Sequence, residues 1–199
     1  IVEDPVRTIE TNILGTELVL RHARKKLKSV VIASTSEVYG KGASIPFRED
    51  DDVVLGPTSK SRWSYAASKM VDEFMGLAYH RQYALPVRIV RFFNTVGPGQ
   101  VGSYGMVIPR LVAQALKGEA LTVYGDGCQQ RCFADVSDVV RGVADMMACP
   151  TAVGQVYNLG NDKEISIMEL AQRVNALTGN KAGIEKIPYE KAYGEGFED

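Results

Sequence analysis

Tyr65 and Lys69 are the two side chains in this sequence whose types and spacing most directly suggest chemistry. They belong to the run Tyr65-Ala-Ala-Ser-Lys69, and a separation of four residues on a helix places them on one face, one turn apart. A neighbouring ammonium favours the phenolate, so we expect the pKa of Tyr65 to be lowered toward working pH. Such a tyrosine can take the proton of a substrate hydroxyl while hydride leaves the same carbon. Alone, the pair is a weak signal, because tyrosine and lysine are both common on exposed helix faces.

A second group of polar residues follows a short apolar run. Residues 29–33 read Ser-Val-Val-Ile-Ala, which suits a buried parallel strand, and S-T-S-E-V-Y-G comes directly after it at residues 34–40. Hydroxyl groups at the carboxyl end of such a strand lie where open α/β sheets bind ligands. Serine and threonine also serve turns there, since their side chains bond nearby backbone. The combination of this run with Tyr65 and Lys69 is much more specific than either part alone.

Strands and helices alternate along the chain, and they would position these groups. The expected helices cover residues 5–27, 62–82, 106–117, 137–148 and 166–178, and the expected strands cover 29–33, 85–92, 121–124, 130–133 and 155–159. The first two strands are continuous apolar runs, which is typical of a parallel sheet covered by helices on both faces. Shorter, more polar elements after about residue 100 predict a smaller lobe. The polar stretch 35–61 is long for a connection, and such loops are more often functional than idle.

A third run, R-F-F-N-T-V-G-P at residues 91–98, lies at the end of the second strand. In this order the three runs resemble the extended short-chain dehydrogenase/reductase family, the NAD-dependent nucleotide-sugar epimerases, dehydratases and decarboxylases. The resemblance continues with Asn12, Gly15 and Thr16, with residues 121–127, 130–131 and 135–139, and with residues 157–160. It implies a partial Rossmann-like, doubly wound parallel sheet with a smaller C-terminal substrate-binding lobe. Residues 1–100 would be the second half of an NAD-binding domain and 101–199 mostly the nucleotide-sugar lobe, with about 130–148 rejoining the first domain.

The resemblance implies a catalytic group and a cofactor group at the strand ends. Tyr65 would be the base, Lys69 its partner and a ligand of the nicotinamide ribose, and Thr35 would bond the sugar hydroxyl that is oxidised. The implied catalytic set is Thr35, Glu37, Tyr65 and Lys69. The implied contacts to NAD are Asn12, Ser34, Tyr65, Lys69 and Phe92, of which Phe92 would lie near the nicotinamide.

The resemblance also implies a nucleotide-sugar substrate, which we expect to be a UDP-sugar. Asn94 would bind the diphosphate, Tyr124 would pack on the base, and Arg131 would pair with a phosphate, which suits a guanidinium fork. The implied substrate contacts are Thr35, Ser36, Asn94, Val107, Tyr124 and Arg131.

Residues 97–102 satisfy the pattern G-x-G-x-x-G, but their context differs from that of a dinucleotide fingerprint. The fingerprint opens directly into a helix of the first βαβ unit, whereas Pro98 and the spacer 103–105 do not suit a helix start. We interpret this segment as a substrate loop. The sequence holds neither the true glycine motif nor the acidic ribose-binding residue, so it leaves NAD and NADP open. Both ends look cut, and we expect the fragment alone to be inactive.

Within the family, the residues after Thr35 bear on the reaction. Family chemistry begins with oxidation at the sugar C4, and 4,6-dehydratases typically carry Asp-Glu at the position where this chain has Ser36-Glu37. Dehydration is therefore disfavoured. S-T-S-E-V-Y-G resembles UDP-glucuronate decarboxylases, in which a 4-keto group lies β to the C6 carboxylate, whereas a 4-epimerase needs no acid at Glu37. We place a UDP-sugar 4-epimerase first and a UDP-glucuronate decarboxylase close behind; a non-catalytic nucleotide-binding regulator would usually have lost Tyr65 or Lys69.

Composition disfavours several other classes of protein. The net charge of −1 gives no electrostatic case for nucleic acid or an anionic membrane, and no apolar run is long enough to span a bilayer. The three cysteines and the acidic residues 49–52 lack metal-ligand spacing, so no metal site is expected. Three cysteines without a C-x-x-C pair fit a reducing cytoplasm. Because family members commonly pair two helices, we expect a homodimer through residues 5–27 and 62–82.

Overall fold

The computed structural model describes residues 4–102 and 106–188. The chain divides into two compact units. Unit 1 holds the residues up to Phe93 together with Ser137–Gly160, and unit 2 holds Asn94–Val136 together with the residues from Asn161 onward. Each unit has a hydrophobic core of its own.

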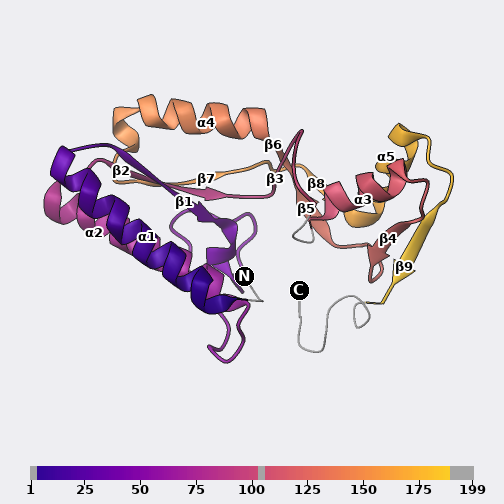
Figure 1. Ribbon diagram of the computed structural model, residues 1–199, viewed down its shortest axis with the longest axis horizontal. Coiled ribbons are helices and arrows are strands. Elements are labelled where there is room, and N and C mark those ends of the chain that lie inside the picture. Colours follow the sequence, from indigo (N-terminus) through magenta and orange to yellow (C-terminus); the bar gives the residue numbers. More distant parts are fainter. Residues whose placement is uncertain (1–3, 103–105, 189–199) are drawn as a thin grey trace. The chain divides into compact units, whose positions relative to one another are not determined.

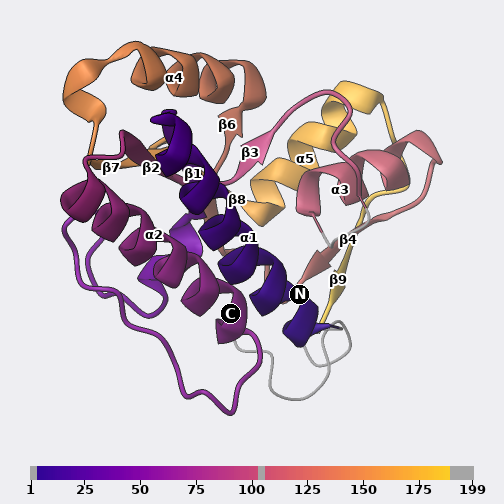
Figure 2. The same ribbon diagram turned by 60° about the vertical axis from the view of Figure 1, so that its left-hand side comes forward.

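Unit 1 is built on a parallel sheet of three strands in the order β1-β2-β7. The strands are β1 (Val30–Thr35), β2 (Val87–Phe92) and β7 (Val156–Leu159). The helices α1 (Pro5–Lys26) and α2 (Trp63–Tyr83) lie side by side on one face, and α4 (Val136–Ala148) covers the other (Figures 1 and 2). This arrangement confirms the expected α/β class with a parallel sheet between helices.

On the face of the sheet that α1 and α2 cover, apolar side chains pack these helices against the strands. Leu20 of α1 and Leu85, Val87 and Ile89 around β2 are fully buried, with Ile32 of β1 5% exposed. Gly76 lets α2 approach β1 closely, since a Cβ there would collide with the side chain of Ile32. This close approach brings the polar residues of α2 to the end of β1.

In its described residues, unit 2 combines two helices with three short strand pairs. The helices α3 (Val107–Leu116) and α5 (Ile167–Thr178) pack on β4 (Leu121–Tyr124) and enclose Leu111, Leu121, Val123, Ala171 and Val174. β4 pairs in parallel with β9 (Ile184–Ile187), and β3 (Thr95–Val96) pairs in parallel with β6 (Ala134–Asp135). β5 (Gln130–Cys132) pairs antiparallel with β8 (Glu164–Ser166).

The structure differs from the sequence expectations mainly in its short elements. The five long helices agree with the expected ranges to within one residue at each end. β1 continues to Thr35, so Ser34 and Thr35 belong to the strand and do not follow it, and the 3-10 helix η1 (Ser36–Tyr39) begins at once. β3, β6, β8, β9 and the 3-10 helix η2 (Pro150–Ala152) were not expected, because segments this short carry almost no periodicity.

Two other expectations concern the segment 97–105 and the division of the chain near residue 100. The spacer 103–105, on which the interpretation of residues 97–102 partly rests, lies outside the described residues. The functional division near residue 100 remains a prediction. Among the helices of residues 4–102 and 106–188, none combines the length and apolar character that crossing a bilayer requires.

Candidate active site

The end of β1 and the first turn of α2 place Thr35 and Tyr65 in contact. Thr35 is the N-cap of η1, and its Oγ1 accepts a hydrogen bond from the backbone N–H of Glu37 at 3.2 Å. The side chain of Thr35 also lies next to the hydroxyl of Tyr65. Because the Thr35 oxygen accepts the backbone N–H, its own proton is available for the Tyr65 oxygen. Two hydroxyl groups thus lie together at a strand end, where a substrate hydroxyl can be bound between a base and a donor.

The pKa of Tyr65 is raised in this chain, so the expected lowering is wrong. Burial is the largest cause, and the charges of Glu37 and Asp72 add to it, while the hydrogen bond from Thr35 acts in the opposite direction. The ammonium of Lys69 lies 3.5 Å from the carboxylate of Asp72. Its positive charge is therefore matched by a buried carboxylate one turn further along α2, which sequence spacing alone did not reveal.

Polar residues also link α1 to the face of α2 that carries Tyr65 and Lys69. The amide of Asn12 donates to the hydroxyl of Ser68 at 2.9 Å, and Thr16 of α1 lies near the carboxyl group of Asp72. Asp72 is fully buried, and burial raises its pKa, while Thr16 and Lys69 act in the opposite direction. Sequence reasoning missed Ser68 and Asp72, although each lies three residues after a catalytic candidate and so shares its helix face.

The other residues expected at the cofactor lie at the same strand ends. Ser34 is 3% exposed and its hydroxyl donates to Glu73 of α2. Phe92, at the end of β2, is the direct partner of Thr35 in the sheet register and is half-buried. Ser36 is half-buried and Glu37 is exposed, both in η1. The roles of all four at cofactor or substrate remain predictions.

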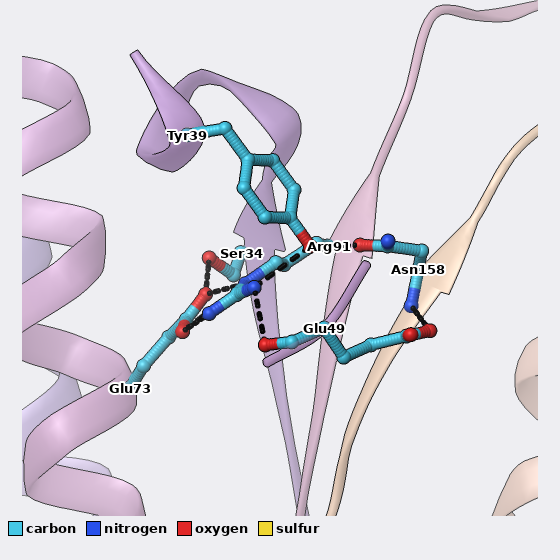
Figure 3. A network of polar contacts seen from close by, with 6 residues as sticks. All are labelled: Ser34, Tyr39, Glu49, Glu73, Arg91 and Asn158. Atoms are coloured by element: carbon cyan, nitrogen blue, oxygen red, sulfur yellow. Dashed lines mark hydrogen bonds and ion pairs between the residues drawn. The ribbon is translucent and has the colours of Figure 1, made fainter. Parts of the chain in front are cut away.

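A buried polar network lies beside these residues, and the sequence had not singled it out (Figure 3). It joins β1, η1, the following loop, α2, β2 and β7 through Ser34, Tyr39, Glu49, Glu73, Arg91 and Asn158. In the sequence Arg91 is only the first residue of the third family run. The available signal was a charge within a mostly apolar strand, since a buried charge requires a partner, and Arg88 of the same strand gives the same signal.

The expected substrate residues Asn94, Val107, Tyr124 and Arg131 belong to unit 2. The exposed Asn94 donates through its side chain to the carbonyl of Cys132 at 3.1 Å, and Val107 begins α3 and packs on the core. The guanidinium of Arg110 lies 4.4 Å from the centre of the Tyr124 ring. Arg131 is half-buried in β5 and donates to the carbonyl of Gln130 at 2.9 Å.

The donor set of unit 1 fits the nicotinamide-ribose part of NAD. The Lys69 ammonium carries three N–H donors, of which Asp72 engages one in the part of the chain that the structure describes, so it can also serve ribose hydroxyls. Tyr65 supplies a hydroxyl at the start of α2, and Phe92 supplies an apolar ring at the end of β2. No group of three or more His, Cys, Asp or Glu suited to a metal ion occurs among residues 4–102 and 106–188.

Comparison with known sequences gives a consistent picture. The model of the NAD dependent epimerase/dehydratase family matches residues 2–160. A UDP-N-acetyl-alpha-D-glucosaminuronate decarboxylase from Bacillus cytotoxicus is 48% identical over 200 residues, covering 100% of this chain and 61% of that protein. UDP-glucuronic acid decarboxylase 1 from Danio rerio is 38% identical over 93% of this chain and 44% of its own length. The chain therefore spans only about half the length of these curated relatives.

Solved structures share the fold. Epimerase Mth375 from Methanothermobacter thermautotrophicus matches with a TM-score of 0.87 at 32% identity, covering 98% of this chain and 57% of that one. UDP-glucuronic acid 4-epimerase from Bacillus cereus, solved in complex with UDP-glucuronic acid and NAD, matches with a TM-score of 0.79 at 27% identity, covering 90% and 55%.

Proposed function

Because the chain belongs to the NAD-dependent epimerase/dehydratase family, we propose that it acts in the NAD-dependent decarboxylation of a UDP-hexuronate. The observation that carries this proposal is the Thr35–Tyr65 pair with Glu37 beside it, in a chain 48% identical along its full length to a UDP-sugar acid decarboxylase. The activity is proposed for the intact protein, since the chain covers 61% of that relative.

The sequence alone had favoured a 4-epimerase, and the comparisons do not single that reaction out. Curated relatives named as decarboxylases favour the reaction that had been placed second. One observation keeps a UDP-hexuronate 4-epimerase as the second candidate, namely the solved UDP-glucuronic acid 4-epimerase with its substrate and NAD. Both candidates act on a UDP-sugar with a C6 carboxylate, so this substrate class is common to them.

The residues of unit 1 suit the first step of either reaction. Tyr65 would accept the proton of the C4 hydroxyl, and Thr35 would hydrogen bond the same oxygen as the carbonyl forms. NAD, when bound, would supply the acceptor for the C4 hydride. Lys69 would hold the nicotinamide ribose. Burial around Tyr65 would keep water from competing for these contacts.

The second step distinguishes decarboxylation from epimerisation. A 4-keto group lies β to the C6 carboxylate, so the C5–C6 bond can break with its electron pair delocalised toward the C4 oxygen while CO2 leaves. A proton then adds at C5. Return of hydride to C4 and of the Tyr65 proton to the C4 oxygen gives a five-carbon UDP-sugar. Glu37, the exposed carboxylate near Tyr65, is the residue we assign to this stage.

We assign the nucleotide half of the substrate to Asn94, Val107, Tyr124 and Arg131 of unit 2. A diphosphate suits the amide of Asn94 and the guanidinium of Arg131, and a base suits the ring of Tyr124. We also retain a homodimer formed through α1 and α2 as part of the proposal. A cytoplasmic location, expected from the cysteine content, remains a prediction.

Product analysis tests the proposed function. The intact protein would be incubated with UDP-glucuronate, UDP-N-acetylglucosaminuronate and UDP-glucose, and CO2 and the sugar nucleotides would be measured. We expect CO2 and a five-carbon UDP-sugar from a UDP-hexuronate. A C4 epimer without CO2 would instead support the second candidate, and no product from any of the three would contradict both.

A further inference from the structure

Arg91 is a buried cation at the carboxyl end of β2, and its hydrogen-bond partners belong to α2, η1 and the loop after η1 (Figure 3). Its side chain is enclosed together with that of Glu73, and the two residues are 6% and 5% exposed. Nε and Nη2 of Arg91 donate to the two carboxylate oxygens of Glu73 at 2.9 and 2.8 Å. Nη1 donates to the hydroxyl of Tyr39 at 2.8 Å and to the backbone carbonyl of Glu49 at 3.0 Å.

The partners of Arg91 and Glu73 bracket the segment that carries the catalytic candidates of η1. On one side, the hydroxyl of Ser34, which immediately precedes Thr35, donates to Glu73. On the other side, Tyr39 follows Glu37 by two residues and is fully buried under Arg91. Both flanks of residues 35–37 are therefore fixed to the same ion pair.

Glu73 also fixes the segment relative to the base. Glu73 and Tyr65 belong to α2 and are separated by roughly two helical turns. β1 is thus bonded to α2 through Ser34 and Glu73, and Thr35 lies next to Tyr65 at the start of the same helix. An anchor on a rigid helix restricts the position of the strand end relative to Tyr65.

A third strand closes the network. The hydroxyl of Tyr39 donates to Oδ1 of Asn158 at 2.7 Å, and the backbone N–H of Asn158 donates to the carboxylate of Glu49 at 2.8 Å. The ring of Tyr39 is stacked on Phe47 with centroids 4.5 Å apart. Since the hydroxyl accepts one hydrogen bond and donates another, it transmits the position of Arg91 to β7 and to the loop after η1.

We propose that Arg91, Glu73 and Tyr39 are positioning residues, which hold Thr35 and Glu37 at the distance from Tyr65 that turnover requires. The proposal rests on the proposed function for the identity of the reaction. An ion pair of this kind need not add net stability, because desolvation of two charges offsets their attraction. The bidentate fork instead defines one distance and one orientation between β2 and α2, which a hydrophobic contact of the same volume does not.

Arg91→Lys is the decisive variant, since it keeps the charge and removes the fork. Arg88→Lys is its matched control: Arg88 lies in the same strand, is 5% exposed, and donates to Ser29 and to the carbonyl of Cys149. We expect Arg91→Lys to lower kcat for UDP-glucuronate about tenfold or more while KM changes less than about threefold, because misplacement of reacting groups affects mainly the chemical step. Arg88→Lys should keep kcat within about twofold. If Arg91→Lys and Arg88→Lys lowered thermal stability to the same extent and also lowered kcat to the same extent, the proposal would be overturned.

A second measurement does not depend on the substrate. Hydrogen exchange of the segment 34–40, which contains the N–H of Glu37, would be followed in the intact protein without substrate. We expect faster exchange there in Arg91→Lys and in Tyr39→Phe, which keeps the ring on Phe47, and unchanged exchange in Arg88→Lys. Unaltered exchange in both test variants would refute the network. Wild-type protein that converts no UDP-hexuronate would refute the proposed function instead, and the exchange result would still decide the network.

Discussion

At the scale of single residues, the proposed chemistry depends on Thr35 and Tyr65 lying side by side. Thr35 Oγ1 accepts the backbone N–H of Glu37, which leaves its own proton available for the oxygen of Tyr65. Tyr65 itself has a raised pKa, chiefly because of burial. The phenol is therefore predominantly protonated in the chain by itself, and the groups that surround it determine how readily it becomes a base.

Removal of the Tyr65 hydroxyl should abolish turnover and leave the fold intact. We expect Tyr65→Phe to lower kcat by a factor of about 10² or more, since general bases contribute about 10²–10⁴-fold. Tyr79→Phe, in the same helix, is the control and should retain activity. A Tyr65→Phe protein that retained more than about a tenth of wild-type kcat would exclude the assigned role.

Glu37→Gln should separate the two candidate reactions. In a decarboxylase the charge of Glu37 would act at the C5–C6 end of the sugar, so its loss should lower kcat on the order of 10²-fold. In a 4-epimerase, Tyr65 and Thr35 suffice and the loss should be modest. The assay compares CO2 release with C4 epimerisation of UDP-glucuronate, and Glu17→Gln on the surface of α1 serves as the control. Epimerisation that survives the change, with no CO2 from wild type, would refute decarboxylation.

At the scale of elements, the face between α1 and α2 controls the electrostatics of the site. Burial raises the pKa of Asp72 of α2, the neighbouring Thr16 of α1 acts in the opposite direction, and Asp72 pairs with Lys69 at 3.5 Å. Besides burial and the charge of Glu37, the charge of Asp72 raises the pKa of Tyr65. Packing of two helices thus determines which charge the base experiences.

Asp72→Asn should shift the pH dependence of activity to lower pH. If Tyr65 acts as a phenolate, kcat/KM rises with pH through the pKa of Tyr65. The substitution removes a negative charge that raises this pKa and frees the positive charge of Lys69, and both changes favour the phenolate, so the rising limb should move to lower pH. Asp138→Asn, at an exposed ion pair of α4, is the control. A rising limb that stayed in place, or moved up, would contradict this coupling.

At the scale of the whole molecule, exposed apolar side chains on α1 and α2 indicate an interface. Val6, Leu14 and Val19 of α1 are 63%, 62% and 55% exposed, and Phe74 of α2 is 64% exposed. Apolar residues gathered on two adjacent helices are costly to leave in water and mark association sites. The family resemblance favours a second copy of this chain as the partner that binds this surface of α1 and α2.

Charges on this surface should dissociate the proposed dimer. The double variant Leu14→Glu/Phe74→Glu would bury two unpaired carboxylates at the interface, which is strongly unfavourable. Sedimentation at micromolar concentration should show a dimer for the intact wild type and a monomer for the variant. Leu177→Glu, on an 88% exposed residue of α5, should leave the dimer intact. A monomeric wild type would refute the interface directly.

The sequence by itself determined the long elements and placed the candidate site residues at their ends. Helical periodicity in 5–27 and 62–82, and mostly apolar runs before Ser34 and at residues 85–92, predicted the α/β class, because side-chain spacing follows directly from backbone geometry. The same runs placed Thr35, Tyr65 and Phe92 at strand ends and a helix start. Short strands such as β8 and β9 escaped detection, since pairing with distant partners stabilises them.

Only the tertiary structure decided the partners of each charged group. The sequence placed Lys69 beside Tyr65 but could not show that the pKa of Tyr65 is raised, because burial and the carboxylate of Asp72 depend on how α1, α2 and β1 pack. Likewise, Arg91 and Glu73 belong to different elements, and their spacing in the sequence does not predict their ion pair. Electrostatic interactions depend on distance and local dielectric, and folding brings together groups that the chain keeps far apart.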